Sequence, residues 1–456
     1  MQSSTIWLQN TESMVQKMRK MKDSGIEWIG EIPEGWEVTK IKHIVSSVTD
    51  IDHFMPDSVE SGIPYLMIGN LKDLSSSIDW DSSKKISIED YKKLSIKSRP
   101  QKGDIIFARY ASIGTTCYID TDRDFLVSYA CLTIHPSDLI IGKFLSYYLK
   151  SSSFAEDVLR RTNSNTQGNV GKDSLVNATI VLPSIIEQTQ IVNFLEAKCS
   201  DINAMLSKTR SSIEEYKKLK QSVITQAVTK GVRGEREMKP TGFTRWSEIP
   251  SDWELKRVKP CAASITSGLS AVTDDTNSEE SGNFVLRTSA VSSGFFVPTE
   301  VKPVLKSAVN RLICPVEPDT LIVSRMNTAS MVGACAYVAN NHPNTFLPDK
   351  LWKIKFHSCY HTKYMWYALN SVPAKSWFSE LATGASSSMQ NISINDFTSN
   401  YLPIPAFSEQ KEIAAYLDAK CAEIDGLIAK KEQLVKELES YKKSLIYEVV
   451  TGKREV

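Results

Sequence analysis

The chain contains one segment twice, and the two copies are separated by a constant 222 residues, the difference between positions 409 and 187. The copies share an acid–amide pair, an aromatic–leucine pair and an Ala-Lys-Cys triplet, namely Glu187-Gln188, Phe194-Leu195 and Ala197-Lys198-Cys199 against Glu409-Gln410, Tyr416-Leu417 and Ala419-Lys420-Cys421. A duplicated chain can place two similar surfaces about an approximate twofold axis. The repeat therefore predicts a protein that presents two related surfaces to one extended ligand.

A longer repeat predicts the domain organisation. Residues 31–38 match residues 248–255, and each octad opens a globular module. A chain of 456 residues has room for about three domains. We expect an N-terminal tail at 1–22, a first module at 23–183, a long helix at 184–231, a second module at 232–404 and a second long helix at 405–456. The modules diverge between their shared anchors, so we expect the frame to repeat and the surface to differ.

Each module is expected to be mixed α/β. Residues 102–109 combine turn residues, an apolar β-prone run and an arginine, and residues 317–325 echo them. Such a pattern predicts a buried strand that emerges into a loop. A helix is expected near 144–159 in the first module and near 364–381 in the second.

The two long helices carry heptad repeats. Apolar residues recur every seven positions along two seams, which predicts a coiled coil because a strict heptad keeps one seam turned toward a partner helix. The seam residues are Leu195, Ile202, Leu206, Ile213 and Tyr216 in the first helix and Leu417, Ile424, Ile428, Val435 and Leu438 in the second.

The ends and the midpoints of these helices are also marked. Ser184 and Glu187 fit a capping box, and Gly231 and Gly452 stand where the helices should end. At 1.5 Å per residue each helix would span roughly 65 Å. Thr209 and Lys431 interrupt the seams, and in an antiparallel pair we expect them to face one another.

The charge balance limits how the chain could bind a polyanion. Its formal net charge is only +1, from 54 Lys and Arg against 53 Asp and Glu. Any nucleic-acid affinity must therefore come from local basic patches or from partner subunits.

The cysteines and the hydropathy indicate a cellular compartment. The eight cysteines are scattered, with no Cys-x-x-Cys and no Cys/His pair at zinc spacing, which predicts reduced thiols. Residues 1–22 lack the apolar core of a signal peptide, and no stretch approaches the ~18 apolar residues of a membrane span. We expect a soluble cytoplasmic protein that does not contact a membrane.

No motif for catalysis is found in the sequence. There is no Pro-Pro dipeptide for an adenine methyltransferase motif and no GxxxxGK[ST] phosphate loop. The histidines show no metal-ligand spacing, and no Ser or Cys lies in a nucleophile motif. One alternative stays open, a nuclease that uses Asp57 and Asp90 in a PD…DxK-like pattern, although such short matches arise often by chance.

Two polar loops in each module are candidates for contact with nucleic acid. An arginine follows the predicted buried strand in both modules, and guanidinium and amide groups suit base edges in the major groove. The alternative is that each arginine pairs with a local carboxylate, and that the second polar loop is an ordinary loop. The candidate residues are Arg109, Tyr110, Ser112, Arg160, Arg161, Asn163, Asn165 and Gln167 in the first module and Arg287, Arg325, Asn327, Ser386, Ser387, Gln390 and Asn391 in the second.

Together these motifs resemble the specificity subunits of type I restriction-modification systems. The resemblance rests on residues 28–37, which open the first module, and on Leu-Pro followed by Glu-Gln at 182–188 and again at 402–410. It covers nearly the whole chain after the tail. It implies an α/β fold with two mixed α/β target-recognition domains, separated by two long antiparallel coiled-coil helices in a pseudo-twofold internal repeat.

The resemblance also implies partners and a role. Each domain would read one half of a split double-stranded DNA target, and the helices would dock two methyltransferase subunits. Those partners would bind S-adenosylmethionine and methylate adenine N6, and restriction subunits would add cleavage driven by ATP with Mg²⁺. This chain would be non-catalytic and would itself hold no cofactor and no metal.

Two departures and two alternatives accompany the resemblance. The second module opens with Arg245-Trp246-Ser247 where the first has Trp28-Ile29-Gly30, and the link from Leu-Pro to Glu-Gln is two residues longer in the second half. We expect a small difference in how each module joins its helix. The alternatives are a non-enzymatic coiled-coil scaffold that binds proteins, and a specificity subunit of a related methyltransferase or nuclease without restriction subunits.

Overall fold

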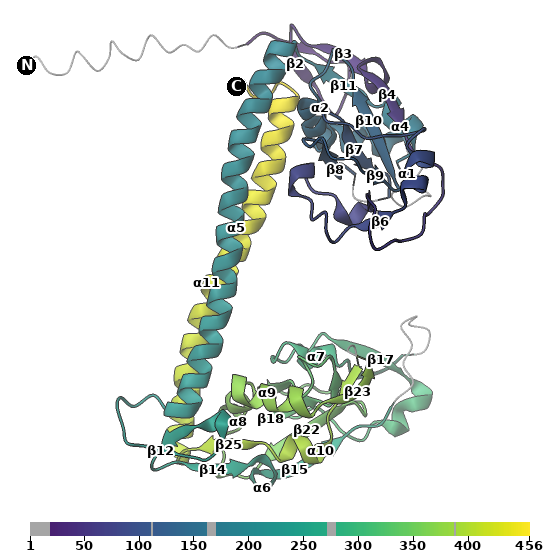
Figure 1. The fold of residues 1–456 in the computed structure, drawn as a ribbon. Coiled ribbons are helices and arrows are strands. Elements are labelled where there is room, and N and C mark those ends of the chain that lie inside the picture. The colour runs from purple at the N-terminus through teal and green to yellow at the C-terminus, as the bar shows by residue number, and fades with distance from the viewer. Residues whose placement is uncertain (1–18, 111–112, 162–169, 271–279, 387–388) are drawn as a thin grey trace, which may run out of the picture. The chain divides into compact units, whose positions relative to one another are not determined.

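The computed structural model describes residues 19–456 except 111–112, 162–169, 271–279 and 387–388 (Figure 1). The chain folds as two compact units. Unit 1 comprises Met1–Thr209 and Gln433–Val456, and unit 2 comprises Arg210–Glu432. Each unit contains one globular module and about half of each long helix. We refer to the modules as module 1 and module 2.

Module 1 is built around a four-stranded antiparallel sheet. Its strand order is β4-β10-β7-β8, with β4 at Val45–Thr49, β10 at Cys131–Pro136, β7 at Ile105–Ala108 and β8 at Thr116–Tyr118. A smaller sheet has the order β6-β5-β9, with β6 at Lys84–Ile86, β5 at Ile63–Leu66 and β9 at Leu126–Val127. Strand β7 is buried along its whole length, as its run of β-branched and aromatic residues predicts.

Module 2 repeats both of these sheets and adds a third. Its main sheet has the order β15-β22-β18-β20, at Ala262–Ser267, Leu351–Phe356, Thr320–Ser324 and Cys335–Val338. Its smaller sheet has the order β17-β16-β21, at Val301–Leu305, Glu280–Leu286 and Thr345–Phe346. A further sheet has the order β19-β24-β23, at Met326–Asn327, Met389–Asn391 and Thr383–Ser386. The predicted repetition of the frame is confirmed.

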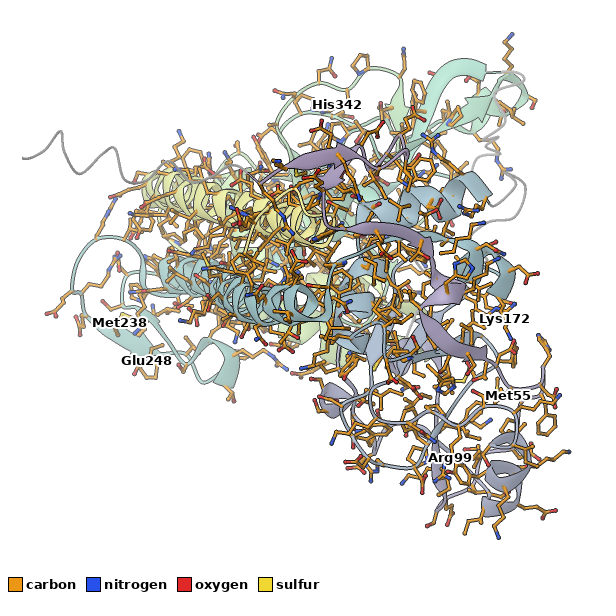
Figure 2. The ribbon with its side chains drawn as sticks, turned by 90° about the horizontal axis from the view of Figure 1, so that it is seen from above. Met55, Arg99, Lys172, Met238, Glu248 and His342 are labelled. Carbon is orange, nitrogen blue, oxygen red and sulfur yellow. The ribbon has the colours of Figure 1, made fainter. Side chains whose placement is uncertain are left out.

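Each module opens with a pair of neighbouring strands, and its next strand pairs with the last strand of the module. In module 1 these pairs are β1–β2 at Met21–Asp23 and Glu31–Pro33, and β3–β11 at Glu37–Lys40 and Thr179–Leu182. In module 2 they are β12–β13 at Met238–Pro240 and Glu248–Pro250, and β14–β25 at Glu254–Arg257 and Tyr401–Ile404. Met238 and Glu248 begin the two strands of β12–β13 and are both labelled in Figure 2. Each module is thus closed where it meets the long helices.

Short helices cover the sheets of each module. Those of module 1 are α1 at Ile88–Leu94, α2 at Gly142–Leu149, α3 at Ser152–Arg161 and α4 at Lys172–Asn177. Those of module 2 are α6 at Val258–Cys261, α7 at Ser289–Ser292, α8 at Thr362–Leu369, α9 at Val372–Leu381 and α10 at Ile394–Thr398. Short 3-10 helices lie at Ile41–His43, Ile68–Asn70, Ser75–Ser77, Thr244–Trp246 and Lys306–Arg311.

The single helix expected in each module is two helices. In module 1 the break lies at Ser151, whose hydroxyl donates to Tyr148 O at 2.7 Å and accepts from Phe154 N at 3.3 Å. In module 2 Ser371 precedes α9 as its N-cap residue, and a proline follows in the first turn. Serine favours such a start because its side chain competes with the helical backbone for hydrogen bonds.

The long helices are α5 at Ile185–Lys230 and α11 at Phe407–Val450. They pair antiparallel in both units, since Lys442 Nζ donates to Asn203 Oδ1 at 2.9 Å in unit 1 and Lys220 Nζ donates to Asp425 Oδ2 at 2.6 Å in unit 2. The predicted antiparallel coiled coil is confirmed. Six of the predicted seam residues are buried and four are half-buried, the latter being Tyr216, Ile428, Val435 and Leu438.

The ends of the helices follow their capping residues. Ser184 Oγ accepts from Glu187 N at 3.4 Å, and Ser184 N donates to Glu187 Oε2 at 3.3 Å, so the predicted capping box is present. Gly231 and Gly452 take φ of +78° and +73°, a conformation that suits glycine.

Thr209 and Lys431 lie in different units and each makes a contact within its own unit, so the expectation that they face one another stays a prediction. Thr209 Oγ1 donates to Met205 O within its own helix at 2.8 Å. Lys431 Nζ lies 5.7 Å from the centre of the Tyr216 ring. A β-branched hydroxyl that bonds the preceding turn needs no partner across the seam.

Candidate nucleic-acid interface

An acid at the start of each long helix fixes the module that precedes it. Glu187 of α5 accepts a hydrogen bond from Trp36 Nε1 at 3.3 Å, and Glu409 of α11 accepts from Trp253 Nε1 at 3.1 Å. An arginine also pairs with each acid, Arg19 with Glu187 and Arg236 with Glu409. Both tryptophans are almost fully buried. The octad repeat and the Glu-Gln repeat therefore contact one another in both units. We call this contact, between the opening tryptophan of a module and the acid at the start of the long helix, the joint of that module.

The electrostatics of this joint favour the charged carboxylate. Burial raises the pKa of Glu187, but hydrogen bonds from Trp36 and Ser184 and the charge of Arg19 more than offset burial, so its pKa lies below the ordinary value. A negative group at the first turn of a helix also interacts favourably with the helix dipole.

The glutamine next to each acid ties a second segment of the module to the helix. Gln188 Oε1 accepts from Ile141 N at 2.8 Å, and its Nε2 donates to Leu139 O at 3.1 Å and Pro183 O at 3.0 Å. Gln410 Oε1 accepts from His361 N at 2.8 Å, and its Nε2 donates to Pro405 O at 2.9 Å. The anchored segment leads into α2 in module 1 and into α8 in module 2. Both glutamines are buried, so these bonds are shielded from water.

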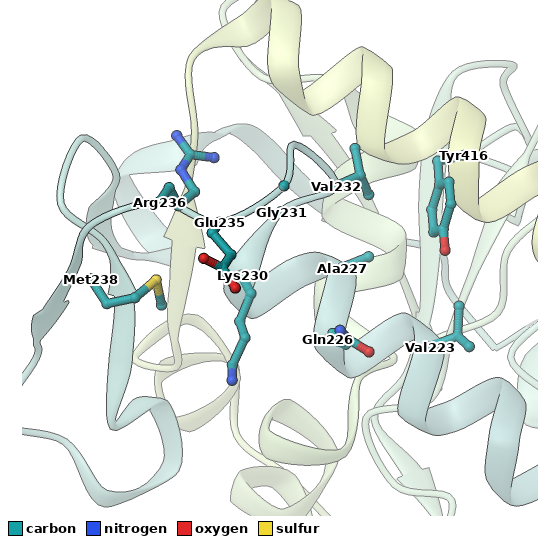
Figure 3. Close-up of a pocket in the computed structure, with 11 residues that line it drawn as sticks. Val223, Gln226, Ala227, Lys230, Gly231, Val232, Glu235, Arg236, Met238 and Tyr416 are labelled. Atoms are coloured by element: carbon teal, nitrogen blue, oxygen red, sulfur yellow. The ribbon is translucent and has the colours of Figure 1, made fainter.

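Each opening tryptophan also meets the end of the other long helix. A Cβ on Gly452, after α11, would lie 3.2 Å from Trp36, and a Cβ on Gly231, after α5, would lie 3.2 Å from Trp253. In unit 2 the segment after Gly231 borders a cavity of about 650 Å³ with Lys230, Arg236 and Tyr416 in its wall (Figure 3). Each module is therefore held by the start of one helix and the end of the other.

In each module, a residue that follows the second candidate loop and a residue that precedes a central strand both bond to the backbone of the arginine. Arg109 N donates to Ala130 O at 2.9 Å, and Arg109 O accepts from Val170 N at 3.0 Å, directly after the second polar loop. In module 2, Arg325 N donates to Lys350 O at 3.2 Å, and Arg325 O accepts from Ile392 N at 3.0 Å. Three segments thus meet at the same point of both frames. We call this point the arginine junction.

The two arginine side chains are held differently. Arg109 Nη1 donates to Asp50 Oδ2 at 3.2 Å, and its side chain is 21% exposed. The pairing of this arginine with a local carboxylate, which the sequence left open, is thus present. Arg325 lies over the Trp352 ring, 6.0 Å from its centre. The residue of β15 that corresponds to Asp50 is Ser267, because the strand pairings align Thr49 with Thr266.

Each junction contains a buried polar atom that has no hydrogen-bond partner among the residues that the structure describes. In module 1 this atom is Arg109 Nε, and in module 2 it is Asn391 Oδ1. Such atoms are rare in folded proteins, because burying an unpaired polar group is costly. Tyr110, next to Arg109, is 48% exposed. The junctions therefore have unused hydrogen-bonding capacity.

Several other candidates make contacts within their own module. Arg160 pairs with Glu156 at 2.8 Å and Glu27 at 3.1 Å, and Arg161 pairs with the buried Asp157 at 3.0 Å. These pairs fasten the end of α3 to the module and compete with any contact to a ligand.

In module 2 the remaining described candidates are similarly engaged. Arg287 Nε donates to Val301 O at 3.2 Å, Asn327 Nδ2 to Ser292 Oγ at 2.9 Å and Gln390 Nε2 to Gly384 O at 3.4 Å. The candidates Ser112, Asn163, Asn165, Gln167 and Ser387 lie outside the described residues, and so does the side chain of Ser386.

Residues that the sequence did not single out also line the junctions. Asp50 holds Arg109, and the backbone of Lys350, an exposed residue, holds Arg325. The His53 and Tyr129 rings contact one another with centres 3.8 Å apart and planes tilted by 37°, and Tyr129 precedes Ala130 of the junction. The signal that could have found the last segment is its place directly before β10 or β22, the strand beside the predicted buried strand.

The described residues offer no metal-binding site that would support the nuclease alternative. The Asp90 carboxylate accepts from Ser87 Oγ at 2.9 Å, and Ser87, the N-cap residue of α1, accepts from Asp90 N at 3.0 Å. Within the described part of the chain, no three His, Cys, Asp or Glu residues are grouped so that they could hold a metal ion.

Two further findings concern the thiols and the helices. All eight cysteines fall within the described ranges and are free, and seven of them are buried. Burial raises the pKa of Cys117 and of Cys131 to about 12.

Among the described residues, no helix has both the length and the apolar character needed to cross a membrane.

Comparison with known proteins gives a consistent match. The family model of the type I restriction modification DNA specificity domain matches twice, at residues 33–215 and 250–437. The MjaX protein of Methanocaldococcus jannaschii, provisionally named a type I restriction enzyme specificity subunit, is 26% identical over 93% of this chain and 95% of its own. The EcoKI type I restriction enzyme specificity subunit of Escherichia coli strain K12 is 18% identical over 90% of this chain and 88% of its own.

A solved structure shares the fold. A chain from a study of complex assembly and conformational transition of the type I restriction-modification system superposes with a TM-score of 0.67. It is 17% identical and covers 93% of this chain and 99% of its own length. The double match of the family model extends over most of both modules and both helices. The chain therefore belongs to the family of type I restriction-modification specificity subunits.

Proposed function

We propose that each module of this specificity subunit reads one part of a bipartite DNA target, and that the long helices bind methyltransferase subunits. The observation that carries the proposal is the pair of arginine junctions. In both frames the backbone of an arginine bonds to a segment that follows the second polar loop, and the surrounding residues differ. A shared frame with different side chains at its contact point suits two readers of unlike half-sites.

The local chemistry supports base contact more than phosphate contact. Arg109 forms an ion pair with Asp50. The carboxylate weakens the attraction of the guanidinium for phosphate and fixes the direction in which the remaining N–H groups of the guanidinium point. The net charge of +1 agrees with a subunit that depends on its partners for much of its affinity.

In this proposal the chain is non-catalytic and positions DNA for its partners. S-adenosylmethionine would be bound by two methyltransferase subunits that methylate adenine N6, and ATP with Mg²⁺ by restriction subunits, in the cytoplasm where host DNA is accessible. Contacts from the modules would set the register, and the duplex would be presented to the methyltransferase for flipping of the target base.

The test uses the full chain assembled with its methyltransferase subunit. Arg109→Ala should relax the preference for one half-site and Arg325→Ala the preference for the other, each by ~1–3 kcal/mol. Binding to randomised DNA, followed by sequencing of the bound fraction, measures both. Arg99→Ala is the control. Arg99 pairs with Asp124 on the exposed surface of module 1, so we expect this variant to leave the sequence preference unchanged.

Three outcomes separate the proposal from the alternatives. A protein-binding scaffold would show no sequence preference and no steep dependence on salt. Loss of both half-sites in a single variant would indicate misfolding and would be visible as a lower melting temperature. If neither arginine variant changed the preference at either half-site, the arginine junctions would not be the reading sites.

A further inference from the structure

The arginine junction of module 1 lies where two strands of its main sheet end. Strands β4 and β7 both pair antiparallel with β10, which lies between them, so β4 and β7 run in the same direction and end at the same edge of the sheet. Asp50 is the first residue after β4, and Arg109 is the first residue after β7. The sheet therefore brings a carboxylate and a guanidinium together, and Arg109 Nη1 donates to Asp50 Oδ2 at 3.2 Å.

The contacts of the Arg109 guanidinium decide which of its nitrogens a ligand can reach. Nε is buried, so it is not accessible from solvent. Nη1 carries two hydrogens, and Asp50 accepts one of them. The guanidinium carbon lies 5.7 Å from the centre of the Tyr110 ring, which holds the group on a second side. The second hydrogen of Nη1 and the hydrogens of Nη2 are thus the donors that can meet a ligand.

Two adjacent N–H donors match one base in the major groove of DNA. Guanine presents two acceptors there, N7 and O6, and an arginine can donate to both at once. Adenine has an amino donor beside its N7, cytosine presents an amino donor, and thymine presents a single acceptor. Because a guanidinium has no acceptor, it cannot pair with the amino groups of adenine or cytosine.

The charge of Asp50 decides between a base and a phosphate as the ligand. A phosphate also offers two oxygens to an arginine, but it is negatively charged. Asp50 lies at contact distance from Arg109, so its carboxylate repels a phosphate that approaches the same guanidinium. Guanine is neutral and meets no such repulsion. In module 2, Ser267 takes the place of Asp50, so Arg325 is not restricted in this way.

We infer that Arg109 reads a guanine in the half-site of module 1, through Nη1 and Nη2 in the major groove. Asp50 is a positioning residue, because it fixes the guanidinium before DNA binds and directs it toward a base in preference to a phosphate. The inference rests on the proposed function and adds the identity of one base and the role of Asp50.

The first test identifies the base that Arg109 reads. The full chain, assembled with its methyltransferase subunit, is bound to randomised DNA, and the bound fraction is sequenced. Arg109→Ala should remove the preference at one position, and the unaltered complex should require a G·C pair there. Discrimination at that position should fall about tenfold to a hundredfold. Loss of preference for an A·T pair instead would overturn the inference.

A change in the DNA alone gives a second test that does not depend on the folding of a variant. 7-Deazaguanine at this position removes the N7 acceptor and keeps the pairing with cytosine. It should weaken binding by the unaltered complex about tenfold, and it should not weaken binding by the Arg109→Ala complex further. An equal loss in both complexes would show that another group contacts N7, which would also overturn the inference.

Asp50→Asn tests the positioning role. We expect this variant to prefer the G·C pair less, to bind unrelated DNA more tightly and to depend more steeply on salt, with a logarithmic slope larger by up to ~1, because the freed guanidinium gains a phosphate. A merely structural role of Asp50 would lower the melting temperature and leave the salt slope unchanged. Asp52→Asn is the matched control, since Asp52 pairs with Lys97 on the exposed surface, and it should keep the preference for the G·C pair.

The outcomes distinguish this inference from the proposed function. If the unaltered complex showed no sequence preference, the proposed function would fail. If the preference were present and Arg109→Ala lowered affinity equally for all sequences, with a salt slope smaller by about 1, Arg109 would contact a phosphate and only the inference would be refuted. An Arg109→Ala complex with unchanged preference and affinity would refute it as well.

Discussion

Replacing Gln188 with methionine should loosen module 1 from its helix. Methionine keeps the length of the side chain but removes three hydrogen bonds, those to Ile141 N, Leu139 O and Pro183 O. Because Gln188 is fully buried, the Ile141 N–H would lose its partner in a place that water does not reach. An unsatisfied buried donor costs ~1–3 kcal/mol, and with the lost bonds to two carbonyls we expect a destabilisation of about 2–5 kcal/mol.

The equivalent glutamine of the second copy, Gln410, allows a matched variant, and an exposed glutamine of the same helix, Gln190, serves as the control. Gln410→Met removes two hydrogen bonds, to His361 N and Pro405 O, and should therefore cost less than Gln188→Met. Gln190→Met alters an exposed position of the same helix and should stay within about 0.5 kcal/mol. Hydrogen exchange measured by mass spectrometry shows which module is destabilised, because it reports opening of the segment before α2 separately from opening of the segment before α8.

The expected pattern is specific. Gln188→Met should raise exchange in the segment that contains Ile141 and leave the segment that contains His361 unchanged, and Gln410→Met should do the reverse. Equal effects of Gln188→Met and Gln190→Met, or a cost below about 0.5 kcal/mol for Gln188→Met, would refute the view that this amide fixes the module.

Three further changes have defined outcomes. Asp50→Ser frees Arg109 and should weaken discrimination at the half-site of module 1 by about 1 kcal/mol, whereas Ser267→Asp should alter only the other half-site; selection from randomised DNA reports both. Gly452→Ala should destabilise unit 1 by ~1–2 kcal/mol or more, because the φ of Gly452 is +73° and the new Cβ would collide with Pro33. Gly426 has open space around it, so Gly426→Ala should stabilise α11 by up to ~1 kcal/mol. Thermal melts measure both changes. Hydrogen bonds from Lys353 and Lys355 hold the pKa of Glu317 below its ordinary value of 4.5. This carboxylate therefore stabilises the fold fully above pH 4.5 and loses that contribution as the pH falls through its lowered pKa, so Glu317→Gln should reduce the acid sensitivity of module 2 in melts at pH 3 to 7.

The sequence predicted the frame well because the frame depends on patterns that repeat. The heptads identified the helix pair, and the Trp and Glu-Gln repeats marked segments that turn out to bind one another. The same patterns could not separate α2 from α3, since apolar periodicity continues across Ser151 and only its hydroxyl contacts reveal the break. They also did not indicate the contact of Lys431 with Tyr216, which depends on the register of the pair.

The candidate site was predicted less completely for a physical reason. The sequence located both arginines, because each follows a buried strand, and it located both polar loops. It did not indicate that the segment after the second loop bonds to the arginine, since the bonds from Val170 N and Ile392 N join segments far apart in the chain. Asp50 was missed because a single acid after a strand has no spacing that distinguishes it from a solvated one.

The joint made by Trp36, Glu187 and Gln188, and by their equivalents in module 2, lies outside the loops that differ between the modules. A recognition module can therefore acquire new side chains at its contact surface, or be exchanged as a whole for another with the same joint, while its attachment to the helices stays intact. Changes in those loops should therefore cost the attachment of a module to the helices little stability.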